Sequence, residues 1–223
     1  MSDTRKPTTA LSTLGVDRRK TLFLLLLLFA IPATTCSAQT APPAFDEKVL
    51  ENVSPTVKAR LAMRFSLGAF SGRFEDTPLS AVRKAVGAGT IQHQGDAAGS
   101  LNWLCYQRGQ NRLWVTSGEM GGDDHRVTEI VAELTGKDTA TAADCATLPD
   151  KFAPLVFDGR LRLGMSRAEV VKVMGQPSKS DDAQTIYLHA GKVAKDFDET
   201  AWFRLQFRED KLVSMRGGKS TVN

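Results

Sequence analysis

Hydrophobic and polar residues follow nearly the same order in two parts of the chain, which predicts a repeated unit. The clearer part opens with a short helix, because Ser166 is a good N-cap, Glu169 completes a capping box, and Gly175 is a stop signal. A helix of little more than two turns is not stable alone, so it must pack against other elements. It is followed by three runs with the two-residue periodicity of strands, at 184–190, 201–207 and 212–216.

The same order of signals occurs upstream at an offset of 87 to 88 residues. Phe70–Phe74 resembles Phe157–Leu161, and Pro78–Gly87 aligns with the helix that ends at Gly175. Strand-like runs again come after the helix, at 101–107, 112–116 and 126–134. An additional amphipathic helix is predicted before this unit, from Ser54 to about Phe65.

These elements predict an α+β fold of two tandem copies, each with a short helix or two packed on a three-stranded antiparallel sheet. The predicted organisation is a signal peptide at 1–38, a flexible N-terminus at 39–53, a first repeat at 54–136, a linker at 137–150, a second repeat at 151–219 and a tail at 220–223.

The N-terminal segment has the pattern of a secretory signal, with basic residues at 18–20, an apolar run at 22–31 and small residues before Ala38. The apolar run is half the length of about 20 residues that a bilayer-spanning helix needs. We expect cleavage after Ala38 and a periplasmic or secreted protein. The alternative is a lipoprotein anchored at Cys36, against which Thr35 argues.

Removal of this segment changes the charge balance. It carries five of the 29 basic and two of the 25 acidic residues, which leaves 24 basic and 23 acidic. The basic character of the whole chain therefore gives no reason to expect a nucleic-acid partner, since no dense Lys/Arg stripe remains.

Two cysteines, Cys105 and Cys145, remain after the predicted cleavage. An even number of cysteines in an exported chain predicts a disulfide. The chain has no C-x-x-C spacing of the kind that reactive or metal-binding thiol pairs more often show.

The second repeat resembles a known module. The pattern Gly-Met-Ser, a short helix ending Met-Gly-Gln-Pro, and Tyr187, Phe207 and Val213 on the strands is similar to the SmpA/OmlA (BamE) type. In tandem, such units resemble the architecture of β-lactamase inhibitory protein. The match covers about 60 residues, whereas the first copy lacks the Gly-Met pair and has Gly87-Ala88-Gly89 at the end of its helix. The resemblance implies a fold and supplies no catalytic residue.

The sequence offers little for catalysis. Its three histidines, His93, His125 and His189, accompany no G-x-S-x-G elbow and no H-E-x-x-H pattern. We expect no enzyme activity, no cofactor and no metal site.

Strand alternation places all three tryptophans, with several arginines, on the face of each sheet opposite the helices. Tryptophan, tyrosine and arginine are enriched at the energetic centres of protein interfaces. The candidate partner-binding residues on these outer faces are Trp103, Arg112, Trp114, Tyr187, His189, Trp202, Arg204 and Arg208. The alternative is that the N-terminal helix, the linker or the other sheet covers these aromatics.

The connection Gly118–His125 is a second candidate for contacts, with Asp123 and Asp124 on a glycine-rich turn. These acids could enter a partner's cleft or hold a cation, or only keep the turn soluble. The predicted function is binding of another envelope protein, as an assembly scaffold or as an inhibitor or immunity protein that blocks an enzyme or toxin. A membrane partner is expected only if Cys36 is lipidated.

Overall fold

The computed structural model describes residues 41–57, 61–96, 99–136 and 142–223, so the predicted signal peptide and residues 137–141 of the predicted linker lie outside the described part. In the described residues no helix is long and apolar enough to cross a membrane. The elements, in chain order, are α1 Lys48–Glu51, β1 Arg64–Leu67, β2 Phe70–Arg73, α2 Leu79–Val86, β3 Gln92–Asp96, β4 Gly99–Arg108, β5 Asn111–Ser117, the 3-10 turn η1 Glu119–Gly121, β6 Glu129–Leu134, β7 Ala146–Thr147, the 3-10 turn η2 Asp150–Phe152, β8 Leu155–Phe157, α3 Arg167–Met174, β9 Lys179–Ser180, β10 Gln184–Ala194, β11 Phe197–Arg208 and β12 Lys211–Val222.

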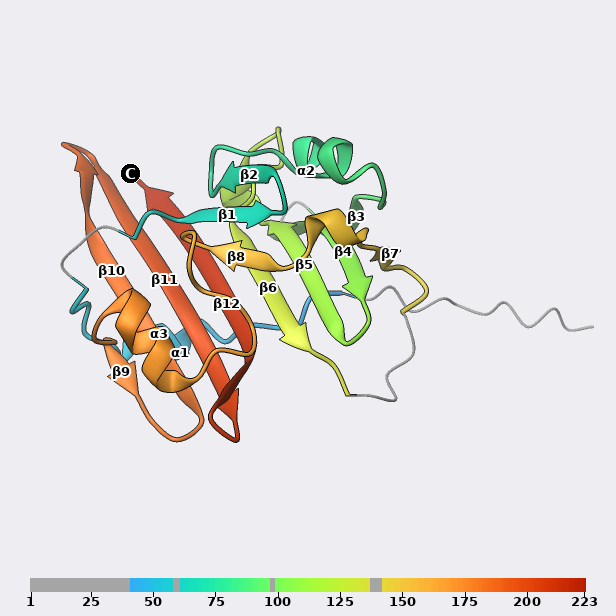
Figure 1. Ribbon diagram of the computed structural model, residues 1–223. Coiled ribbons are helices and arrows are strands. Elements are labelled where there is room, and N and C mark those ends of the chain that lie inside the picture. The colour runs from blue at the N-terminus through green and yellow to red at the C-terminus, as the bar shows by residue number, and fades with distance from the viewer. Residues whose placement is uncertain (1–40, 58–60, 97–98, 137–141) are drawn as a thin grey trace, which may run out of the picture. The chain divides into compact units, whose positions relative to one another are not determined.

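Nine of these strands form one continuous sheet (Figure 1). Its order is β3-β4-β5-β6-β12-β11-β10-β9, and β7 pairs in parallel with β4 at Tyr106 and Gln107, beyond the residues that pair with β3. A short helix followed by a three-strand meander occurs twice, as α2 with β4-β5-β6 and as α3 with β10-β11-β12.

The predicted fold class, with helices on separate three-stranded sheets, is therefore wrong. The two meanders join edge to edge through β6 and β12, with Ala132 opposite Met215 and Ile130 opposite Gly217. Alternation assigns each residue to a face but says nothing of which edge a strand joins. Backbone N–H and C=O groups along the edges of β6 and β12 would cost free energy if they were left without partners. The pairing of the two strands supplies these groups with hydrogen-bond partners.

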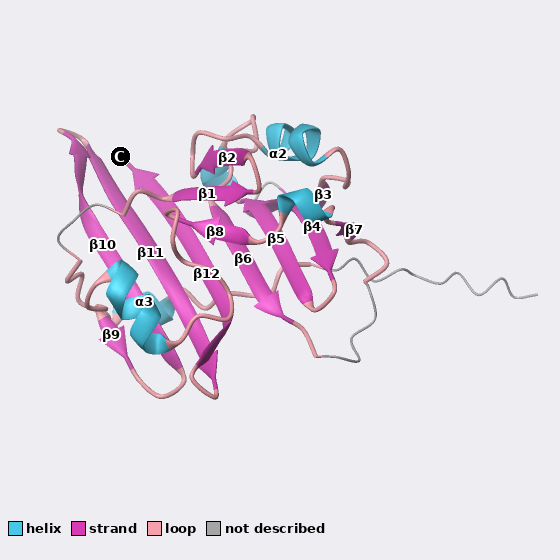
Figure 2. Ribbon diagram, in the orientation of Figure 1, coloured by secondary structure: helices cyan, strands magenta, loops and turns pink. Residues whose placement is uncertain are grey.

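A second, three-stranded sheet of order β2-β1-β8 lies across one face of the large sheet (Figure 2). Here the helix predicted from Ser54 to Phe65 is also wrong, since Arg64–Leu67 is a strand. Leu61, Met63, Phe65 and Leu67 are apolar at every second position, and this strand period prevails over the helical spacing of Val57, Leu61 and Phe65.

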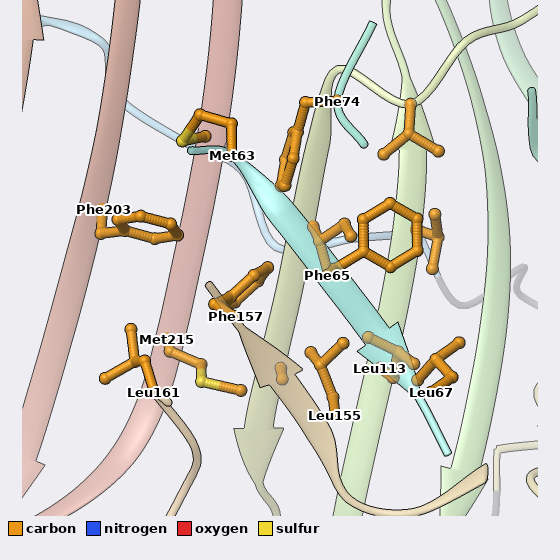
Figure 3. Close-up of a cluster of buried hydrophobic side chains, with 14 of the residues drawn as sticks. Met63, Phe65, Leu67, Phe74, Leu113, Leu155, Phe157, Leu161, Phe203 and Met215 are labelled. Carbon is orange, nitrogen blue, oxygen red and sulfur yellow. The ribbon is translucent and has the colours of Figure 1, made fainter. Parts of the chain in front are cut away.

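The main hydrophobic core fills the space between the two sheets (Figure 3). Phe157 of the small sheet contacts Phe203 of the large one with ring centroids 5.2 Å apart, and Phe65 pairs with Phe157 across the small sheet. All three are fully buried. Burial of such a side chain stabilises the fold by about 1.5–3 kcal/mol, so this layer holds the two sheets together.

Two glycines on β12 allow aromatic rings to cover both faces of the joining strand. A Cβ at Gly217 would lie 2.5 Å from the Phe203 ring, and a Cβ at Gly218 would lie 2.5 Å from the Trp202 ring. These glycines stand directly opposite the two aromatic residues in the β11–β12 pairing. No side chain could replace either glycine without moving a large ring.

The short helices α2 and α3 begin and end close to where their signals predict. Ser166 and Glu169 form the complete capping box, and Glu169 accepts hydrogen bonds from the Ser166 backbone and hydroxyl that lower the pKa of its carboxyl. Tyr187 of β10 donates to the carbonyl of Gly175 at 3.0 Å, which fixes the end of α3 on the sheet.

Gly175 has a φ of 80° and a ψ of −162°, a backbone conformation that is open essentially to glycine alone. We expect Gly175→Val to lower the free energy of unfolding by more than about 1 kcal/mol. Gly87→Asn is the comparison, because Gly87 ends α2 in the left-handed helical region (φ 78°, ψ 13°), which asparagine tolerates, and it should cost clearly less. Urea unfolding of the parent and the two variants measures the difference, and equal losses of stability in both variants would contradict the requirement for glycine at position 175.

The predicted disulfide between Cys105 and Cys145 is present and joins positions 40 residues apart. On the chain-entropy account, a loop of this length stabilises the fold by about 3–4 kcal/mol. The Cys105→Ala/Cys145→Ala variant should therefore melt at a lower temperature than the parent. Reductant should lower the melting temperature of the parent and leave that of the double variant unchanged; an equal response of both would show that the effect is not due to this bond.

Candidate binding surface at one end of the sheet

The two tryptophans of the first meander are on the predicted face of the sheet but are not accessible. Trp103 and Trp114 are buried in a small cluster with the disulfide and Val131. The segment before Cys145 covers this cluster. A hydrogen bond from the backbone N–H of Ala142 to the Gln107 side chain holds the segment in place. The covered arrangement, which the sequence left open as an alternative, is the one observed here.

Trp202 is covered by the N-terminal segment 41–57, which we call the strap. Phe45 stacks on Trp202 with ring centroids 4.5 Å apart and 13° between the ring planes. Arg216 lies 4.6 Å from the centre of the Phe45 ring, and donates to the carbonyl of Pro43 at 2.8 Å and to Glu129 at 2.6 Å. Segment 39–53 was predicted to be flexible, and its described part contains α1 and these contacts.

Glu129 forms the ion pair beneath the strap. Burial raises the pKa of the Glu129 carboxyl above its ordinary value, and the Arg216 guanidinium opposes this shift. Arg204 lies 6.0 Å from the Phe45 ring and donates to Gln184. Of the arginines predicted as partner contacts, Arg204 thus lies beside the strap, whereas Arg216, which holds the strap, was not among them.

The remaining predicted contacts are spread over the molecule. Tyr187 is buried in the main core on the opposite face, so its predicted side is wrong. His189 shares a hydrogen bond with the Val57 carbonyl at 2.8 Å, Arg112 donates to Gln107, and Arg208 is exposed at the far end of β11. Asp123 and Asp124 are exposed, as expected for the Gly118–His125 connection.

Large apolar side chains that are exposed occur at one end of the sheet. In the described residues they are Met120, Val193, Phe197 and Val222, with exposed fractions of 49%, 39%, 43% and 47%. The register places them at the same end of the sheet. Glu129 pairs with both Thr116 and Gly218, so the β5–β6 connection leaves the sheet at the end toward which β12 and the β10–β11 turn extend. We call this end, formed by 119–126, 192–198 and 220–222, the rim.

A groove of about 550 Å³ lies within the rim. It runs between Met120–Asp124 on one side and Thr221 on the other, with Glu75 and Arg126 also lining it. Its walls carry the carboxylates of Glu75, Asp123 and Asp124 against one guanidinium, that of Arg126, which lies 3.2 Å from Asp124. In the described part of the chain no group of three His, Cys, Asp or Glu side chains is placed to hold a metal ion.

The β5–β6 connection is fixed by hydrogen bonds at several points. Thr128 accepts from the Gly118 N–H at 3.0 Å, and the carbonyl of His125 accepts from the first N–H of α2 at Leu79. Gly121 packs so closely that a Cβ would lie 1.9 Å from the Ser117 hydroxyl. The exposed residues of this connection are therefore presented on a fixed backbone.

Glu75 anchors the end of β12 in the rim. Its carboxylate accepts from the Thr221 N–H at 2.8 Å and the Thr221 hydroxyl at 2.7 Å, and contacts the Lys219 ammonium at 2.5 Å. The same ammonium lies 3.2 Å from Glu199, which is 1% exposed. The Lys219 ammonium on β12 thus links this strand to β11 and to the loop after β2.

The sequence interpretation missed Val193, Phe197 and Val222 because it ended the strands too early. Gln184–Ala194, Phe197–Arg208 and Lys211–Val222 are all longer than predicted, and 220–222, predicted as a tail, is part of β12. The pair Lys195-Asp196 between apolar residues is a turn signal that could have extended the hairpin.

Comparisons with known proteins do not assign the chain to a family. No family model matches it, and no curated protein matches it. Among solved structures, one match is a Streptococcus mutans protein described as a "putative beta-lactamase inhibitor protein", with 9% identity, 71% of this chain and 91% of that chain covered, and a TM-score of 0.24. A likeness this low carries no argument about fold or function, and the resemblance to the SmpA/OmlA module stays a prediction.

Lys219→Met should strongly destabilise the protein, because it removes the ammonium beside the buried Glu199 carboxylate. Breaking a buried pair in this way costs about 3–5 kcal/mol. Lys192→Met is the matched control, since Lys192 and Asp198 form an exposed pair at 3.2 Å whose loss should cost less than about 1 kcal/mol. Urea unfolding tests both, and similar losses for the two variants would contradict the anchoring role.

Proposed function

We propose that this protein binds another protein of the cell envelope through the rim and has no catalytic role. The observation that carries the proposal is that the exposed large apolar side chains of the described chain all lie at one end of the sheet. Apolar patches bordered by polar residues mark protein-binding sites, since exposing them to water is unfavourable.

The local structure of the rim suits this role. Its apolar side chains stand on strand ends and on a hydrogen-bonded connection, so little backbone ordering is needed on binding. Asp123 and Asp124 beside the groove favour a partner that presents basic residues there. The tryptophan face is covered by the strap and by the segment before Cys145, and so it does not serve as the first contact in this proposal.

An extracytoplasmic location is part of the proposal. It is supported by the pattern of the first 38 residues and by the Cys105–Cys145 disulfide, a bond typical of oxidising compartments. Within the envelope, the rim could serve an assembly scaffold or an inhibitor, and the identity of the bound protein separates these roles.

The test is crosslinking of the tagged full chain in the cell envelope, with the captured proteins identified by mass spectrometry. Met120→Ser/Phe197→Ser should lose a specific partner that the parent retains. Val171→Ser is the control, because this half-buried residue lies on α3 outside the rim. Capture of the same proteins by all three, with unchanged melting temperatures, would overturn the rim as the binding surface.

The captured protein then decides the role. A component of an assembly machine would support the scaffold, and a hydrolase or toxin whose activity the parent suppresses would support the inhibitor.

A further inference from the structure

A pocket of about 380 Å³ lies at the end of the sheet opposite the rim. It opens beside the β4–β5 turn, between the large sheet and the segment that runs from η2 through β8. Its apolar lining consists mainly of Leu113, Ala132, Leu148, Leu155, Leu163 and Met215. Figure 3 shows Leu113, Leu155 and Met215 among the buried side chains of the main core.

The floor of the pocket offers no free polar group. Tyr106 lies there, but it is fully buried and its hydroxyl donates to the Ala88 carbonyl at 3.1 Å. Burial raises the pKa of Tyr106 to about 12, so this hydroxyl stays neutral. The inner part of the pocket therefore favours an apolar group.

The mouth of the pocket is basic. Arg108 and Arg162 line it, and Asp150 is its one lining carboxylate, 2.8 Å from the Arg108 guanidinium. Glu169 does not line the pocket, and the pKa of its carboxyl is lowered mainly by the hydrogen bonds from Ser166 and only in small part by Arg162. Arg112 also lines it, yet the guanidinium donates to Gln107 and lies over the Trp114 ring on the other face. A net positive charge thus remains at the entrance.

We propose that this pocket binds a small molecule with an apolar chain or ring and a terminal carboxylate. The apolar part would lie against Leu113, Leu155 and Leu163, and the carboxylate would lie at Arg162 and Arg108. A concave apolar site with a few charged groups at its mouth is the usual form of a small-molecule site, and guanidinium groups pair well with carboxylates. This site is remote from the rim and independent of the proposed function.

The first experiment is calorimetric titration of the full chain with octanoate, octanol and octylamine, which share an apolar chain and differ in the head group. Octanoate should bind most tightly. Arg162→Gln should weaken octanoate binding by about tenfold or more, because a hydrogen bond to a charged group is lost. Arg160→Gln is the matched control, since Arg160 is exposed nearby and does not line the pocket.

A second variant tests the place of the apolar part. Leu163→Trp should fill the pocket and abolish octanoate binding while the melting temperature stays near that of the parent. If this variant unfolds, chemical-shift changes at Leu163, Leu113 and Leu155 on addition of octanoate to the parent locate the site instead.

The proposal is overturned by equal binding of octanol and octanoate, by no binding of octanoate, or by equal effects of Arg162→Gln and Arg160→Gln. The same titration is then made with a short peptide that ends in leucine, once with a free C-terminal carboxylate and once as the C-terminal amide. Binding of the free-acid peptide without binding of octanoate would assign the pocket to a protein C-terminus and would also overturn the small-molecule proposal.

Discussion

The pairing of β6 with β12 is the interaction on which the rest of the structure depends. It joins two three-strand meanders that are far apart in sequence into one sheet, through a register that sets Ala132 against Met215 and Gly218 against Glu129. Each meander alone would leave one edge with unsatisfied backbone groups. Because the sheet is continuous, a single layer formed by β2-β1-β8 can cover the junction, and one core extends over both halves.

The joining strand also determines how the two faces are filled. Gly217 and Gly218 have no side chains, so Phe203 covers β12 on the core side and Trp202 covers it on the other. On that other face, Arg216 forms an ion pair with Glu129 and lies over the ring of Phe45, which stacks on Trp202. The strap and the disulfide-bonded segment thus cover the aromatic residues that alternation brings to the second face of the sheet.

With both faces largely covered, the ends of the sheet remain for contacts with other molecules. At the rim, strand ends and a hydrogen-bonded connection carry exposed apolar side chains beside acidic ones. At the other end, an apolar pocket has a basic mouth. The two ends therefore differ in both shape and charge, which is the physical basis for assigning them different kinds of ligand.

The sequence by itself determined the local elements. The capping box of Ser166 and Glu169, the stop at Gly175 and the pairing of two cysteines depend on neighbouring residues or on an even count, and the structure has all three. It also placed the tryptophans on one face and Asp123 and Asp124 on an exposed connection. Only the tertiary structure decided that the meanders share one sheet, that Leu61–Leu67 belongs to a covering strand region, and that Phe45 lies on Trp202. The reason is that periodicity fixes a residue's face, whereas which edge a strand joins and what covers a face depend on contacts between residues more than 80 positions apart.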